Sequence, residues 1–301
     1  MAYRLQQSAW CVAGVAALTA LSLARAAAQS PGPDRARGST IDRVSRYVEQ
    51  YYGRAQSLMV EETVIVQPVR RDLAADGFAR HLVYDLRFEW TPGAPGEKAR
   101  IEVVRQLLRA NNRPAKPGTE PKCLDPLPVT PEPLAFVLPA HRDEFEFWNA
   151  GPTRLDGRAA VLLDYKALSA GTPTAMPDPQ GTGDLDCVFL DVPGRNRGRI
   201  WVDAETDAVL RVDEGLIGPT DVPVPKDLQV RRRYPMYITL DRNDTTVRYS
   251  PVTFADPEET LMLPTRIESV WVTMGLGTQG TRMIQEYRNY RRFLTTSRIL
   301  Q

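Results

Sequence analysis

The sequence predicts a mainly β domain of antiparallel strands with two helices and many proline-rich connections. From Leu82 to Trp90, every even position is apolar or aromatic, whereas the odd positions are polar or charged apart from Val83. Side chains on a strand alternate between its two faces, so this stretch predicts a strand with one apolar face and one that meets water. Short strand-like runs separated by turn signals fill the rest of the chain, which is the pattern of an antiparallel sandwich or barrel.

The first 28 residues predict a targeting segment. Arg4 lies in a short basic region, Trp10–Leu23 is apolar, and Ala26-Ala27-Ala28 offers small residues at the spacing that signal peptidase requires. This pattern predicts a secretory signal peptide cleaved after Ala28, and the alternative is an uncleaved N-terminal anchor. The apolar run is short for a membrane span, and no later stretch is long and apolar enough to be one.

Removing residues 1–28 removes Arg4 and Arg25 and no acid, so the net charge of +1 becomes −1. A chain so close to neutral is not expected to bind nucleic acid. Two cysteines, Cys123 and Cys187, remain after cleavage. In an exported protein such a pair predicts a disulfide, worth roughly 4 kcal/mol for a loop of about 65 residues; two unpaired buried thiols are the alternative.

The rest of the chain predicts a single domain between two short flanking segments. Residues 29–39 are rich in Pro, Gly and Arg and predict a flexible tether. Residues 40–294 carry the helical and strand patterns and predict one β domain, which is long enough to bury a sizeable core. Residues 295–301 predict a frayed tail.

An amphipathic helix is predicted over Thr40–Ser57, with Ser39 or Thr40 as its N-cap. Pro131–Ala140 predicts a short apolar helix, because a proline is tolerated in the first turn. Asp156-Gly157 predicts a hairpin turn. The predicted strands are Leu58–Pro68, Ala79–Trp90, Ala99–Leu108, Asp143–Trp148, Arg158–Leu168, Cys187–Leu190, Gly198–Asp203, Ala208–Asp213, Val230–Leu240, Thr246–Phe254, Thr265–Leu276 and Thr281–Phe293.

Motifs that could carry chemistry have simpler structural explanations here. Gly275–Gly280 spells G-x-G-x-x-G, but no strand–helix unit surrounds it, which favours a hairpin turn over a dinucleotide site. His81 and His141, the only histidines, lack metal-ligand spacing, so no metal site is predicted. Arg231-Arg232-Arg233 predicts a solvated strand end, with contact to lipid head groups or to a partner's acidic residues as the alternative. No nucleophile elbow, P-loop or Cys–His signature occurs, so we expect neither catalysis nor a cofactor.

Three stretches occur in a suggestive order: a helix leading into a strand at Ile41–Gln67, a hairpin at Gly198–Arg211, and Leu263–Glu268 leading into a further strand. Together they resemble the LolA/LolB-like lipoprotein-carrier superfamily, whose relatives include the sensor domain of RseB-type periplasmic regulators. The resemblance implies an antiparallel half-barrel of about ten strands wrapped around one or two helices, with an apolar concavity that takes acyl chains. Two departures are a greater length, through proline-rich loops, and no aligned counterpart of the arginine with which carriers hold their lid.

We therefore expect a non-enzymatic periplasmic or secreted protein that binds a lipid, a lipoprotein acyl chain or another hydrophobic ligand. The alternative is an envelope interaction or sensor protein whose sheet is filled by its own side chains and whose loops dock a protein partner. A ligand-lining face and an ordinary core have the same sequence pattern. The residues expected to line this face are Leu82, Tyr84, Leu86, Phe88, Trp90, Ile101, Val103, Leu134, Phe136 and Leu138.

Overall fold

The computed structural model describes residues 33–55, 57–91, 100–116, 134–177, 188–275 and 279–292, and every structural statement below concerns these residues. The predicted signal peptide, the C-terminal tail and the Cys123–Cys187 disulfide lie outside them and stay predictions.

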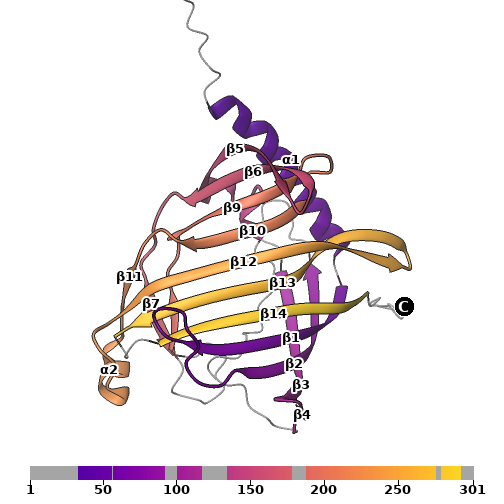
Figure 1. The fold of residues 1–301 in the computed structure, drawn as a ribbon. Coiled ribbons are helices and arrows are strands. Elements are labelled where there is room, and N and C mark those ends of the chain that lie inside the picture. Colours follow the sequence, from indigo (N-terminus) through magenta and orange to yellow (C-terminus); the bar gives the residue numbers. More distant parts are fainter. Residues whose placement is uncertain are drawn as a thin grey trace, which may run out of the picture. The chain divides into compact units, whose positions relative to one another are not determined.

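One antiparallel sheet of twelve strands dominates the described residues (Figure 1). Its strand order is β4-β3-β2-β1-β14-β13-β12-β10-β9-β6-β5, and β11 also pairs with β12. The two ends of this order do not pair, so the sheet is open, which confirms the predicted half-barrel. The strands are β1 (Ser57–Val69), β2 (Arg80–Thr91), β3 (Arg100–Ala110), β4 (Arg113–Pro114), β5 (Phe145–Leu155), β6 (Arg158–Ala167), β9 (Asn196–Asp203), β10 (Val209–Leu216), β11 (Thr220–Pro223), β12 (Tyr237–Ala255), β13 (Glu258–Met274) and β14 (Gln279–Arg292).

Four further elements accompany the sheet. A separate two-stranded sheet pairs β7 (Thr174–Pro177) with β8 (Val188–Asp191). Two short 3₁₀ helices, η1 (Leu134–Val137) and η2 (Arg142–Glu144), precede β5. The η1 helix lies inside the predicted apolar helix, which is confirmed for its described part.

The α1 helix (Pro33–Arg54) begins seven residues before the predicted start at Thr40. The predicted N-cap at Ser39 or Thr40 is therefore wrong, since both residues lie within the helix; a proline is compatible with the first helical turn, so the earlier start carries no penalty. The predicted helical periodicity holds, because Ile41, Val44 and Val48 are buried in the core.

The β12 strand runs unbroken through Asp241–Thr245, the polar run that separates two predicted strands, and β13 begins seven residues before the predicted start at Thr265. Asn243 pairs with Trp271 and Asp244 with Val270 across the hairpin. Backbone pairing does not depend on the polarity of the side chains, and the polar ones here are solvated at the surface. The hairpin turn predicted at Asp156-Gly157 is confirmed, with the positive φ angles of 49° and 84° that a type I′ turn requires.

The predicted strand over Val230–Leu240 is wrong in its first half. The α2 helix (Lys226–Arg232) occupies this region, and β12 begins only at Tyr237. Pro225 stands at its N-cap position, and Arg233 ends the helix in the left-handed conformation, with φ 56°. A helix of seven residues bounded in this way is too short to show a helical period in the sequence.

Gly275, the first glycine of the G-x-G-x-x-G run, follows the last residue of β13 and adopts φ 111°. The two strands that flank the run, β13 and β14, are antiparallel neighbours, with Thr273 opposite Gln279. The run therefore joins two paired strands, as the hairpin interpretation predicted, and no helix follows it in the described residues.

Candidate functional site

The inner face of the sheet, defined here as the face that packs against α1 and η1, is apolar along β1 except at one position. Leu58, Val60, Val64 and Val66 alternate along the strand and are at most 2% exposed. Glu62 lies on the same face in the middle of this series and is 0% exposed. A buried carboxylate requires charged or hydrogen-bonding partners, so its surroundings define the candidate site.

Three side chains from two other strands donate hydrogen bonds to Glu62. Arg105 of β3 approaches it as a fork, with Nε 2.6 Å from Oε2 and Nη2 3.1 Å from Oε1. From β14, the Gln285 amide and the Tyr287 hydroxyl donate to Oε1 at 2.8 Å and 3.1 Å. The Arg105 side chain is only 4% exposed, so this is a buried ion pair in which several hydrogen bonds compensate the loss of solvent.

Arg105 reaches Glu62 across the intervening strand β2. Its guanidinium lies over the ring of Tyr84, 5.8 Å from the ring centroid, and Tyr84 is the cross-strand partner of Glu62. A cation over an aromatic face is attracted by the ring quadrupole. The register of three strands thus brings together a network that no local motif encodes.

The network supplies hydrogen-bond donors to both carboxylate oxygens of Glu62. Burial raises the pKa of the Tyr287 hydroxyl, and the negative charge of Glu62 raises it further, against an opposing effect of Arg105. Tyr287 therefore remains a protonated donor over the physiological range. Both oxygens of Glu62 already accept hydrogen bonds, so neither is placed as a nucleophile or as a general base.

Glu62 separates two apolar clusters on the inner face. The main cluster includes Leu58, Val60 and Leu86 and continues into α1, η1 and the strands β5, β6, β9, β10, β12, β13 and β14. The smaller cluster, called here the β1–β2 cluster, contains Val64, Val66, Leu82, Tyr84 and Met283, with Leu107, Ala110 and Trp271 packed against it. The inner face is therefore apolar, with a buried, hydrogen-bonded charged pair between its two clusters.

Beyond the buried Tyr84 and Leu86, which adjoin this pair, other apolar side chains of the inner face on β2 and β3 are only partly buried. Phe88 and Val103 pack against the main cluster and Leu107 against the β1–β2 cluster, yet all three keep some exposure. The next residues along β3 face outward, with Val104 61% and Leu108 40% exposed. This part of β3 therefore carries partly buried apolar side chains on its inner face and exposed apolar side chains on its outer face.

The predicted lining residues divide between the two clusters. Leu82 and Tyr84 belong to the β1–β2 cluster, whereas Leu86, Leu134 and Phe136 are buried in the main cluster. Phe88, Val103 and Leu138 pack against the main cluster and remain partly exposed. Trp90 and Ile101 oppose each other on β2 and β3. Whether any of these residues contacts a ligand stays a prediction.

The η1 helix fills the inner face beside α1. Leu134 and Val137 are buried, and the Ser45 hydroxyl of α1 donates to the Val137 carbonyl at 2.8 Å. Phe136 extends toward the sheet, with its ring centroid 4.4 Å from that of Tyr165 and 6.1 Å from that of Phe147. The predicted apolar segment therefore covers part of the sheet, as expected, and does so with its own aromatic side chains.

Behind these rings lies a second acidic contact. Tyr165 donates to Glu214 at 2.6 Å and Asn196 donates to the same carboxylate oxygen at 2.8 Å. Burial raises the pKa of Tyr165, and the charge of Glu214 raises it further, so the hydroxyl stays a donor. A Cβ on Gly198 would lie 2.5 Å from the Tyr165 ring and 2.4 Å from the Asp213 carbonyl, so only glycine fits opposite this tyrosine.

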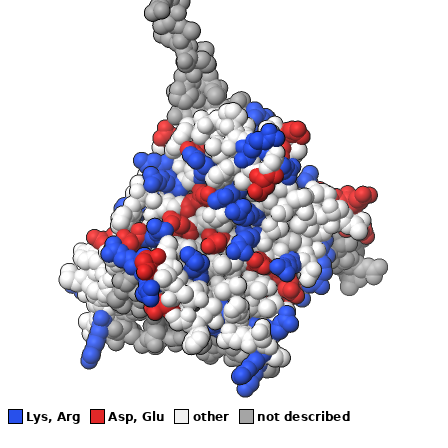
Figure 2. All heavy atoms as spheres, viewed as in Figure 1, with Lys and Arg blue, Asp and Glu red and all other residues white. Residues whose placement is uncertain are grey.

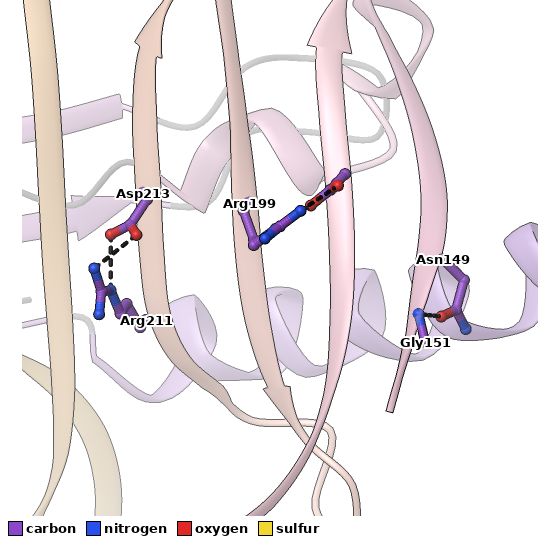
Figure 3. A network of polar contacts seen from close by, with 6 residues as sticks. Asn149, Gly151, Arg199, Arg211 and Asp213 are labelled. Atoms are coloured by element: carbon purple, nitrogen blue, oxygen red, sulfur yellow. Dashed lines mark hydrogen bonds and ion pairs between the residues drawn. The ribbon is translucent and has the colours of Figure 1, made fainter. Parts of the chain in front are cut away.

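The outer face of the sheet is charged and solvated. Lysines, arginines and acids intermingle across it in Figure 2. Figure 3 shows two of its forked ion pairs: Arg199 contacts Asp164 at 2.6 and 2.8 Å, and Arg211 contacts Asp213 at 2.8 and 2.7 Å. Figure 3 also shows the Gly151 amide bonded to the Asn149 side chain at the β5 bulge.

The histidines form no metal site in the part of the chain that the structure describes. His81 is exposed on β2, as predicted, and Nδ1 of His141 lies 3.0 Å from Glu144. The described residues contain no group of three or more His, Cys, Asp and Glu side chains that could hold a metal ion. None of the described helices is long and apolar enough to cross a membrane.

No protein-family model and no curated protein matches the sequence. Solved structures that match include a DUF1329 family protein from Desulfovibrio piger, 10% identical over 86% of this chain and 94% of that chain, with a TM-score of 0.36. Others are a putative outer membrane lipoprotein-sorting protein domain from Vibrio parahaemolyticus (8%, 86% and 95%, TM-score 0.34) and a LolA superfamily protein from Nitrosomonas europaea (12%, 88% and 96%, TM-score 0.29).

Proposed function

We propose that the protein is a non-enzymatic protein of the periplasm that binds a hydrophobic ligand, such as a lipid or the acyl chain of a lipoprotein, on the inner face of its sheet. One observation carries the proposal: on the inner face, the apolar side chains of Phe88, Val103 and Leu107 remain partly exposed on either side of Arg105. An acyl chain on this surface would gain about 25 cal/mol for each Å² of apolar area removed from water.

The buried ion pair suits the same ligand class. Arg105 and Glu62 lie between the two apolar clusters, and Arg105 shares β3 with Val103 and Leu107. Binding sites for small molecules commonly combine an apolar lining with a few fixed polar groups that orient the ligand. An amphiphile would place its chain on the apolar side chains, and the pair, whose side chains are 4% and 0% exposed, would act on the polar end through its charges without direct contact.

The test compares adjacent residues on opposite faces of β3. Val103→Asp places a charge on the inner face and should weaken uptake of a fluorescent fatty acid about ten-fold or more, because a carboxylate would be buried against the chain. Val104→Asp, one residue away on the outer face, should bind as the wild type does. Native mass spectrometry of protein purified from its host should show a bound lipid mass, and a clean apo mass without fatty-acid uptake would contradict the proposal.

A second candidate function is an envelope interaction or sensor protein with a core filled by its own side chains. Its supporting observation is that Leu82 and Leu86 are 0% exposed and that η1 packs its aromatic ring against the sheet. Crosslinking in cells distinguishes the two candidates: a stoichiometric protein partner together with a lipid-free protein favours the second, whereas a co-purifying lipid favours the first.

A further inference from the structure

Apolar side chains protrude at one end of the sheet. Val230 on α2 is 82% exposed, and Met236 and Tyr237, which lead into β12, are 66% and 53% exposed. Phe78, in the connection between β1 and β2, is 99% exposed. Single exposed apolar residues are common, but several at one end of a molecule mark an interaction surface.

The β1–β2 connection, which carries Phe78, and the segment from α2 to the start of β12 lie at the same end of the sheet. β1 ends where β12 begins, because the strands between them, β14 and β13, alternate in direction (Figure 1). Arg71 in the β1–β2 connection lies 3.7 Å from Asp241 near the start of β12. We call residues 70–80 and 225–237 together the α2-end surface.

α2 is firmly attached, so its exposed side is fixed. Leu228 is buried in a small cluster with Val222, Val224 and Ile238, and Tyr234 packs against that cluster. The Gln229 side-chain amide donates to the Val224 carbonyl at 2.7 Å. Val230 is therefore presented to solvent by a helix whose other side is anchored.

The two segments that form this surface are rich in basic residues. Residues 225–237 contain Lys226 and Arg231-Arg232-Arg233 against Asp227, a net charge of +3, and residues 70–80 contain three arginines against two aspartates, a net charge of +1. The whole chain carries +1, so the α2-end surface carries +4 and the remainder −3.

We propose that the α2-end surface docks the protein on an anionic lipid bilayer. The basic residues would contact the lipid phosphates, and Phe78, Val230 and Met236 would enter the layer below the head groups. Surface-bound segments that combine basic and apolar residues bind membranes in this way, with about 1 kcal/mol per basic residue near the surface. Protruding apolar side chains suit a fluid lipid surface, whereas a protein partner would need a matching pocket for each of them.

Vesicle co-sedimentation of the mature chain tests the charge. The protein should bind vesicles of phosphatidylglycerol and phosphatidylcholine at low salt, and it should bind phosphatidylcholine alone far more weakly. Replacing the three arginines (R231Q, R232Q, R233Q) should weaken binding on the order of a hundred-fold. A control with the same charge loss elsewhere (R154Q, R288Q, R291Q) should bind nearly as the wild type does.

A second pair of variants tests the apolar contribution. V230S with M236S should weaken vesicle binding about ten-fold. The control V104S with L168S also removes two exposed apolar side chains, 61% and 60% exposed, but from other surfaces. This control should leave vesicle binding unchanged. Far-UV circular dichroism and the thermal midpoint check that each variant is folded.

Three outcomes would overturn the proposal. They are absence of binding to anionic vesicles, an equal loss in both members of a variant pair, and capture of an acidic protein partner by this surface without vesicle binding. Fatty-acid uptake, which tests the proposed ligand function, should be unchanged in the α2-end variants. Failure of the membrane-docking proposal can therefore be distinguished from failure of the ligand-binding proposal.

Discussion

Two forked arginine–carboxylate pairs stand on opposite faces of the same sheet with nearly the same geometry. Arg105 and Glu62 on the inner face, and Arg199 and Asp164 on the outer face, each have an Nε–oxygen distance of 2.6 Å. Their side chains differ in exposure: 4% and 0% for the inner pair, 45% and 14% for the outer pair. Because the geometry is shared and the exposure differs, we expect burial, and not hydrogen-bond geometry, to decide how much the stability of the protein depends on each pair.

An exposed ion pair contributes between about 0 and 1 kcal/mol, because water screens its charges and holding the side chains costs entropy. A buried pair can be no more stabilising than apolar residues of similar size, since both charges have lost their hydration. Removing one member of a buried pair is nevertheless severe, because the other charge stays buried without compensation. The sheet therefore relies on the presence of both Glu62 and Arg105.

The largest expected effect comes from removing the inner guanidinium. Arg105→Met retains most of the side-chain volume and leaves Glu62 with only neutral donors, so it should lower the free energy of unfolding by about 3–5 kcal/mol. Urea unfolding monitored by tryptophan fluorescence measures this. A loss below about 1 kcal/mol would mean that the pair behaves like a surface pair and that the contrast is false.

A double variant shows whether the loss arises from the uncompensated charge. Glu62→Gln in the Arg105→Met background removes that charge and keeps an acceptor for Gln285 and Tyr287. The double variant should recover at least about half of the lost stability, giving a coupling energy of 1 kcal/mol or more, within the range of about 0.5–3 kcal/mol seen for residues in contact. Strictly additive losses would locate the damage in packing instead.

Asp203 provides a case between the two extremes. Its side chain is 6% exposed and its partner Arg158 is 50% exposed. Asp203 also accepts hydrogen bonds from the amides of Glu205 and Thr206, both at 3.0 Å, which close the turn between β9 and β10. Asp203→Ala removes all of these contacts and should cost about 1–2 kcal/mol, as the loss of a capping side chain does.

The Asp203 contribution should depend on pH. Burial raises the pKa of this carboxyl, but the hydrogen bonds from Glu205 and Thr206 and the charge of Arg158 outweigh burial and lower the pKa below its usual value. A carboxyl whose pKa is lower in the folded state stabilises the fold above its unfolded pKa, about 3.9, and loses this effect as the pH falls through the folded value. The stability difference between wild type and Asp203→Ala should thus shrink from pH 5 to pH 2; a constant difference would contradict an ionic role.

The sequence predicted the features that depend on neighbouring residues and missed those that depend on contacts between distant strands. The alternation around Leu82 and Leu86 predicted β2 and its buried face. The Asp156-Gly157 pair predicted the turn between β5 and β6. Both signals are local in the sequence. The alternation of β1 also placed Glu62 on the apolar face, which was a usable sign of a buried carboxylate. Its partner Arg105 could not be predicted, since it lies two strands away and reaches Glu62 only through the register of β1, β2 and β3.

The smallest effect is expected at the outer pair. Asp164→Ala removes the carboxylate that faces Arg199 and should change the free energy of unfolding by less than about 1 kcal/mol, with the difference decreasing further in salt. Asp164 lies on β6, where Leu163 and Tyr165 point inward, so the substitution leaves the inner face of that strand unchanged. Urea unfolding at low and high salt, in parallel with Arg105→Met, tests the comparison directly. A loss above 2 kcal/mol at Asp164 would show that the charged outer face is a cooperative network, and the division between a sensitive inner pair and a tolerant outer pair would then be wrong.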